Sequence, residues 1–173
     1  AVSPATAATG ADGIASTRWT LGPDEGEQTA SATLEGVGEV AFSATATLIP
    51  ASMTATQGQG QTATVATAVA EAPAVEVLTA TDIPVPGAVV TFSVTEGNGT
   101  VTAAGTTDSS VQVTTDSEGV ATLDSWTLGT TAGSGAHEVT ASVSGVDDVV
   151  FSVSATAGPL DSWSKDSGDG QSG

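Results

Sequence analysis

The sequence predicts an all-β protein built from sandwich domains in tandem. The first observation is internal repetition, because Gly13-Ile14-Ala15 returns as Gly119-Val120-Ala121, and Trp19-Thr20-Leu21-Gly22 returns as Trp126-Thr127-Leu128-Gly129. The second is the nearly constant spacing between these matches, which is close to the size of one small β-sandwich domain. The third is that β-branched and small residues alternate with period two, whereas apolar residues at helical spacing are missing from every long segment.

The repetition continues towards the C-terminus and defines three segments. Gly36 and Val40-Ala41-Phe42-Ser43 match Gly145 and Val149-Val150-Phe151-Ser152, and Gly58-Gln59-Gly60-Gln61 matches Gly168-Asp169-Gly170-Gln171. We therefore expect the following segments: residues 1–49 as the C-terminal half of one repeat, 50–158 as a complete repeat, and 159–173 as the start of a further repeat or a tail that donates a strand. The chain is expected to begin and end inside a repeat.

Composition narrows the possible partners. The chain has 173 residues, a formal net charge of −18, only two basic residues and no cysteine. This negative charge repels phosphate backbones and anionic lipid surfaces, so nucleic-acid binding is disfavoured. Apolar runs long enough to span a membrane are missing, so no membrane insertion is expected. The lack of cysteine excludes disulfides and thiol chemistry.

The strand pattern of residues 50–158 fits one sandwich. Alternation predicts seven strands near Ala63–Val69, Val75–Val77, Val90–Val94, Val111–Val113, Ala121–Leu123, His137–Val143 and Val149–Ala155. A turn at Gly145–Asp148 joins the last two as an antiparallel hairpin, and Asn98-Gly99 is a strong hairpin signal as well as part of a glycosylation sequon. Strands spaced by about 8 to 12 residues fit an immunoglobulin-like sandwich.

Residues 1–49 repeat only the end of this pattern. Ala30–Leu34 and Val40–Leu48 predict a hairpin with a turn at Glu35–Gly38. With the earlier strands of the sandwich missing, Trp19, Leu34, Val40 and Phe42 are expected to lie on an uncovered face. Strands that precede this segment in a longer polypeptide, or strands from a neighbouring subunit, are needed to cover it.

These motifs resemble a known family, the bacterial immunoglobulin-like repeats of invasin- and intimin-type adhesins. The resemblance covers nearly the whole chain and rests on the segments Ile83–Gly87 with Val89–Phe92, Gly97–Gly99, Thr115–Ala121, Trp126–Gly129 and Val149–Ala157. It implies a rod-forming spacer outside the cell and brings no catalytic residues.

The residues themselves provide no catalytic centre. His137 stands without a second histidine, a cysteine or a recognisable nucleophile motif, so neither a catalytic triad nor a zinc site is supported. We expect a surface or sheet-edge position for it. Trp19 and Trp126 occupy equivalent positions in the two copies, which predicts a packing role.

Carboxylates in predicted turns are the only candidate cation ligands. The calcium candidates are Asp116, Glu118, Asp147 and Asp148, and further carboxylates lie at Asp24-Glu25, Asp166 and Asp169. None of them follows the spacing of a calcium-binding loop. The alternative is that these carboxylates only keep an acidic surface hydrated and soluble, and no other cofactor is expected.

The sequence therefore predicts a non-catalytic extracellular or cell-surface protein, a stalk or filament building block on or beyond the bacterial cell. Its expected partners are copies of itself or adjacent repeats, bound by strand complementation or end-to-end contact. One alternative is an adhesin-type binding module that uses loops at one sandwich end, such as Gly97–Gly105 and Thr130–Ala136. Another is a phage virion fibre or decoration domain.

Overall fold

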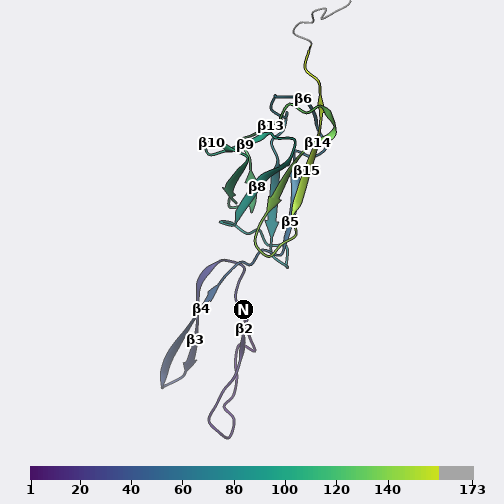
Figure 1. Cartoon of the computed structure of the whole chain (residues 1–173). Helices are drawn as coiled ribbons and strands as arrows, with labels where there is room; N and C mark the ends of the chain where they lie inside the picture. Colours follow the sequence, from purple (N-terminus) through teal and green to yellow (C-terminus); the bar gives the residue numbers. More distant parts are fainter. Residues whose placement is uncertain (160–173) are drawn as a thin grey trace, which may run out of the picture. The chain divides into compact units, whose positions relative to one another are not determined.

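The computed structural model describes residues 1–159 and divides into two compact units, Ala1–Ile49 and a second unit that begins at Pro50 (Figure 1). Every regular element in this part of the chain is a β-strand, as the sequence predicts. No helix among residues 1–159 is long and apolar enough to cross a membrane. The expectation that 159–173 opens a further repeat falls, apart from Pro159, outside the described residues.

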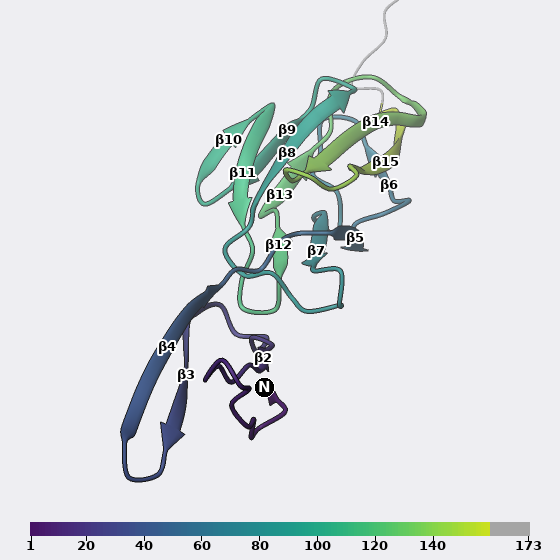
Figure 2. The same ribbon diagram turned by 90° about the horizontal axis from the view of Figure 1, so that it is seen from below.

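The larger sheet of the second unit has the strand order β11-β8-β14-β15-β6. Its pairs are antiparallel except β15 with β6, which run parallel. The strands are β6 (Thr62–Thr64), β8 (Val89–Glu96), β11 (Ser110–Thr114), β14 (Gly133–Ser142) and β15 (Val149–Thr156). Figure 2 shows β8, β14 and β15 side by side.

Two three-stranded sheets, β12-β7-β5 and β10-β9-β13, complete the second unit. Their strands are β5 (Ser52–Gln57), β7 (Ala74–Leu78), β9 (Thr100–Ala103), β10 (Thr106–Asp108), β12 (Val120–Thr122) and β13 (Ser125–Thr127). The unit is thus an immunoglobulin-like β-sandwich.

The core of the second unit is filled from both layers. Fully buried side chains include Phe92 and Phe151 on the larger sheet and Val75 and Trp126 on the smaller ones. The Phe92 and Phe151 rings lie 6.5 Å apart with their planes tilted by 39°, within the range in which aromatic rings attract each other. Because the buried area grows with side-chain size, the aromatic side chains are large single contributors to a core that otherwise consists mainly of Val, Ala and Leu.

The structure differs from the strand prediction in four places, the first being that strands β9, β10 and β13 were not predicted. The predicted strand Ala63–Val69 ends at Thr64, because Ala66 adopts φ +57°, which breaks an extended backbone. Strand β5 was not predicted, since its sequence Ser-Met-Thr-Ala-Thr-Gln has only one large apolar residue. The turn at Gly97–Gly99 is not a hairpin, because β8 and β9 belong to different sheets and the turn carries the chain between them.

The first unit contains four strands in two separate pairs. Strand β1 (Val2–Ser3) pairs with β2 (Arg18–Trp19), and β3 (Gly26–Leu34) pairs with β4 (Gly38–Ala46) as an antiparallel hairpin. The predicted hairpin is therefore present. No residue of Ala1–Ile49, all of which the structure describes, is fully buried.

The β3–β4 hairpin has the same register as the β14–β15 hairpin one repeat later. Ala30 pairs with Phe42 as Val139 pairs with Phe151. Ala32 pairs with Val40 as Ala141 pairs with Val149. The turns match as well, since Val37 N–H donates to Leu34 C=O as Val146 N–H donates to Val143 C=O.

Two earlier features recur in the same way. The Val2–Trp19 pair corresponds to the Val101–Trp126 pair of β9 and β13. The N–H of Gly13 donates to the carbonyl of Gly10, as that of Gly119 donates to the carbonyl of Asp116. Both donor glycines have a positive φ, +77° and +74°, a conformation that glycine adopts without a steric penalty. The two units are therefore built from the same local structures.

What differs between the copies is burial. Phe151 is fully buried, whereas Phe42 is 53% exposed, Val40 is 60% exposed and Leu34 is 62% exposed. The expectation of an uncovered apolar face is confirmed for these three side chains, although Trp19 is half-buried rather than exposed. Full burial of one such side chain stabilises a fold by about 1.5–3 kcal/mol, so this face forgoes several kcal/mol.

Replacing each of the two equivalent phenylalanines by alanine should reveal the difference in burial as a difference in stability. Phe151→Ala removes a packed ring and is expected to lower the free energy of unfolding by about 3–5 kcal/mol. Phe42→Ala should change it by no more than about 0.5 kcal/mol, because the ring is largely solvated. Urea unfolding followed by far-UV circular dichroism measures both. A cost for Phe42→Ala close to that of Phe151→Ala would show that the hairpin face is covered in solution.

Candidate functional site

The one histidine of the chain lies at the end of the sandwich where β8 leaves the larger sheet. The expected surface or sheet-edge position of His137 is wrong, because the side chain is fully buried and β14 is a central strand of its sheet. The physical reason lies in the alternation of the strand itself. His137 shares its face with Val139 and Ala141, both fully buried, so the period of two places the imidazole inside.

Both ring nitrogens of His137 are engaged by backbone groups. Gly129 N–H donates to Nδ1 at a heavy-atom distance of 3.4 Å, and Nε2 lies 2.8 Å from the carbonyl oxygen of Thr131. The tautomer with its proton on Nε2 satisfies both contacts. The imidazole therefore ties the Gly129–Thr131 segment to β14.

The chain segment that follows β8 packs tightly against this ring. Gly97 has φ +87°, and a β-carbon at this position would overlap with the His137 ring and the carbonyl of Ala136. Only glycine combines this backbone conformation with so close an approach. The Gly97 turn and the Gly129–Thr131 segment thus meet at His137.

In the first unit a different residue, Gln28, makes the equivalent pair of hydrogen bonds to backbone groups. Gln28 lies one repeat before His137 and pairs with Ala44 as His137 pairs with Val153. Its Oε1 accepts from Gly22 N–H at 2.6 Å, and its Nε2 donates to the carbonyl of Asp24 at 2.8 Å. Gly22 and Asp24 are in turn the counterparts of Gly129 and Thr131, since both pairs follow the matching tryptophan segments at the same distance. The glutamine amide therefore supplies the same acceptor and donor as the imidazole.

This equivalence assigns His137 a structural task. A glutamine side chain cannot serve as a general base, yet it fills the same position with the same two backbone partners. The equivalence of Gln28 and His137 could have been found in the sequence, since an alignment of the two hairpins matches these two positions. It was missed because the residue types differ and because hydrogen-bonding partners are not visible in a sequence.

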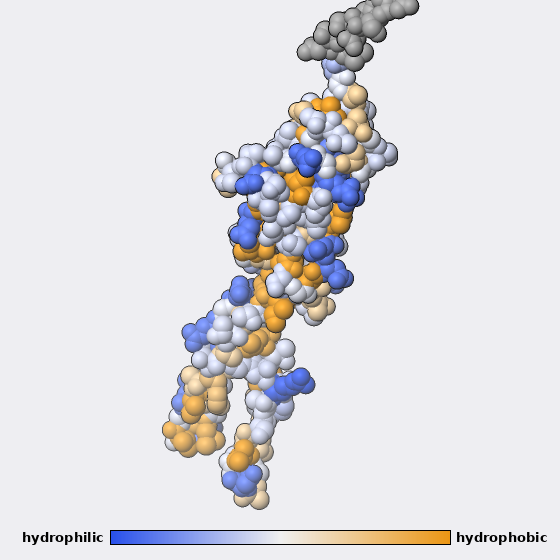
Figure 3. Space-filling view, viewed as in Figure 1, coloured by the Kyte–Doolittle hydropathy of each residue, from blue (hydrophilic) through white to orange (hydrophobic). Residues whose placement is uncertain are grey.

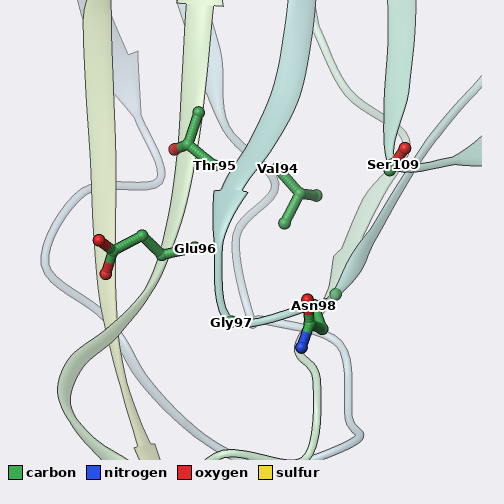
Figure 4. A pocket seen from close by; sticks show the side chains of 7 residues that line it. Val94, Thr95, Glu96, Gly97, Asn98 and Ser109 are labelled. Carbon is green, nitrogen blue, oxygen red and sulfur yellow. The ribbon is translucent and has the colours of Figure 1, made fainter.

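A shallow depression of about 330 Å³ lies beside the Gly97 turn (Figure 4). It is lined by Val94, Thr95, Glu96, Gly97, Asn98, Gly99 and Ser109. Figure 4 shows Val94 on the side of the strand that faces Ser109, whereas Thr95 and Glu96 point the other way. Glu96 is the one ionisable residue in this lining, so the depression offers a polar surface and no paired acid and base.

The two segments expected to be recognition loops, Gly97–Gly105 and Thr130–Ala136, are partly β-strand. Residues 97–105 consist of the turn Gly97–Gly99, strand β9 and the turn at Ala104-Gly105, so the two turns lie at opposite ends of β9. Residues 133–136 belong to β14. From the predicted set, the sandwich end at His137 therefore presents only Gly97–Gly99 and Thr130–Ala132 as loops.

The calcium candidates lie in two exposed turns. Asp116 and Glu118 follow β11, and Asp147 and Asp148 join β14 to β15. The Oδ1 atom of Asp116 already accepts from the N–H groups of Glu118 and Val120, at 2.9 and 3.0 Å. Over residues 1–159, no three side chains of His, Cys, Asp or Glu gather as a metal site requires. A calcium role stays a prediction, and Asp166 and Asp169 are outside the described residues.

The equivalent tryptophans play different parts. Trp126 is completely buried, which agrees with a packing role, and its indole N–H has no hydrogen-bond partner among the described residues. Trp19 is half-buried beside Val2. The tryptophan at this position is therefore fully packed only in the second unit.

Comparison with solved structures finds similarity to parts of glycoside hydrolases. A β-glycosidase from Bacteroides vulgatus is 10% identical over 83% of this chain and 19% of its own, with a TM-score of 0.42. A β-glucuronidase from glycoside hydrolase family 2 is 15% identical over 85% of this chain and 16% of its own (TM-score 0.44). A family 2 member from Bacteroides cellulosilyticus DSM 14838 is 16% identical over 84% and 20% (TM-score 0.41).

This chain spans a fifth or less of each of these proteins. No protein-family model matches the chain, and no curated protein sequence matches it.

Substitutions at His137 should follow hydrogen-bonding capacity. His137→Gln retains an acceptor and a donor and is expected to cost less than about 1 kcal/mol, whereas His137→Leu leaves two backbone groups without partners and should cost about 1–3 kcal/mol. Thermal or urea unfolding measures both variants. Equal losses for the glutamine and leucine variants would contradict the assigned role.

Asp116 provides a separate test of calcium binding. Asp116→Ala removes the acceptor for two backbone N–H groups and should destabilise the turn by about 1 kcal/mol, whereas Asp116→Asn keeps an acceptor oxygen. We expect wild-type protein and Asp116→Asn to melt at the same temperature in calcium and in chelator. A calcium-dependent rise in melting temperature that is confined to the wild type would instead establish Asp116 as a ligand.

Proposed function

We propose that this chain is a segment of a non-catalytic, extracellular repeat protein, which serves as a stalk or filament building block on or beyond the bacterial cell surface. The observation that carries the proposal is the recurrence of one hydrogen-bonded framework. The glycine turn, the tryptophan pair, the backbone contacts of Gln28 or His137 and the final hairpin all return in the same order along the chain. Tandem sandwiches of this kind are a way to build length.

The chemistry of the second unit supports a spacer role. Its histidine is buried and held by backbone groups, and its candidate calcium ligands lie in exposed turns. The net charge of −18 keeps the surface hydrated and soluble. Together with the resemblance of the motifs to invasin- and intimin-type repeats, these features favour a structural role over catalysis.

A binding role is the second candidate, and the depression beside Asn98 favours it. It is hollowed at the sandwich end and combines the apolar side chain of Val94 with the polar groups of Asn98 and Ser109. Recognition sites use such combinations of an apolar surface with a few polar groups. The small number of exposed aromatic side chains makes this role secondary to that of a spacer.

Electron microscopy of the native material tests the proposed role. We expect threads with an axial repeat of about 35–50 Å, the length of one sandwich with strands of about 6 to 8 residues and loops at each end. Fractionation should place the material outside the cell or at its surface. Compact particles without an axial repeat, or recovery from the cytoplasm, would contradict the proposal.

A further inference from the structure

The first unit has one face that is ready to receive another layer of protein. We call it the acceptor face, formed by Ala30, Ala32, Leu34, Val40 and Phe42 on one side of the β3–β4 hairpin. Strands β3 and β4 pair only with each other among the described residues, so both outer edges of the hairpin are unpaired there. Figure 3 shows hydrophobic surface on this hairpin.

The second unit shows what covers the same face when the sandwich is complete. Strand β8 pairs along the outer edge of β14, with Phe92 opposite Ala141 and Val94 opposite Val139. On the other side, β6 runs parallel to β15, with Ala63 opposite Ala155. Strand β5 lies against β15 from the second layer. All of these covering strands come from residues 50–96.

The equivalences give the position of a covering strand on the acceptor face. Because Ala32 corresponds to Ala141 and Ala30 to Val139, a strand like β8 would place its phenylalanine opposite Ala32 and its last valine, the counterpart of Val94, opposite Ala30. That phenylalanine would then meet Phe42 as Phe92 meets Phe151. A strand like β6 would pair with β4 at Ala46.

A second copy of this chain is a poor donor of these strands. Its β6 and β8 are already hydrogen-bonded to β15 and β14, and Phe92 and Val90 are fully buried. Donating them would open the core that they close. In the second unit the covering strands come from the same polypeptide, directly before β9, and only the Gly97–Gly99 turn lies between.

We propose that the acceptor face is a strand-accepting site, whose occupant is a segment with the pattern of residues 50–96, supplied by the same polypeptide on the N-terminal side of the first unit. The inference deepens the proposed structural role and rests on it. It specifies a partner, a register and a source for the strands that complete the sandwich.

The test adds the missing segment to the full chain. Since Val2 corresponds to Val101, a copy of residues 50–99 placed directly before Ala1 restores the connection found in the second unit. Hydrogen exchange followed by mass spectrometry compares the amides of β3 and β4 in the extended and original chains. We expect exchange in these strands to slow at least about 100-fold, because both edges become hydrogen-bonded.

Two matched variants of the extended chain distinguish pairing of the added strands on the acceptor face from an unspecific stabilisation of the chain. Ala32→Asp places a charge opposite the added phenylalanine and should abolish the protection. Ala41→Asp lies on the opposite face, at the position of the 47%-exposed Val150, and should leave the protection intact. The amides of residues 50–158 provide an internal reference for folding in every variant.

The outcomes decide the proposal. Protection that Ala32→Asp removes and Ala41→Asp preserves would support it. Unchanged exchange in the extended chain would overturn it, and so would protection that is insensitive to Ala32→Asp. If the original chain is already protected and sediments as a dimer, the occupant is a second copy and the proposal is wrong. If the exchange experiment contradicts strand acceptance, microscopy still tests the stalk or filament role. Compact native particles would contradict the stalk or filament role and would not change the exchange result.

Discussion

The structure depends on covering one apolar face of a two-stranded hairpin. A hairpin alone is marginally stable in water, because its apolar side chains stay hydrated and its edges stay unpaired. In the second unit the β14–β15 hairpin lies between β8 and β6 and against a second layer, and Val139, Ala141, Phe151 and Val153 on its inner face are almost completely buried. In the first unit the same hairpin is formed in the same register without that cover. Local pairing therefore survives, whereas a core does not form.

The loop that follows the tryptophan strand in each unit depends on a smaller constraint. The segment after the tryptophan strand is hydrogen-bonded to one side chain in the first strand of the hairpin. That side chain accepts from a backbone N–H and donates to a backbone carbonyl of the segment. It is a histidine in the second unit and a glutamine in the first. Two chemically different side chains thus make the same pair of backbone contacts, which gives the buried histidine a structural role.

Part of the fold and little of the site were predictable. The period of the repeat, the two hairpins and the inward face of β14 follow from alternation and matching motifs. His137 is buried where a surface position was expected, because the alternation of β14 places it on the same inward face as Val139 and Ala141. Strand β5, the short strands β9, β10 and β13, and the break at Ala66 were not predicted, since short strands poor in apolar residues and a positive φ at alanine leave no clear pattern in the sequence.

The all-β class, the repeat length and the hairpin register follow from the amino-acid pattern, because these depend on residues close together in the chain and on a period of two. Which faces are buried depends on the assembled fold. Phe42 and Phe151 stand in matching sequences and matching strands, yet one is 53% exposed and the other fully buried. Burial depends on strands distant in sequence, and those strands are assembled around Phe151 alone.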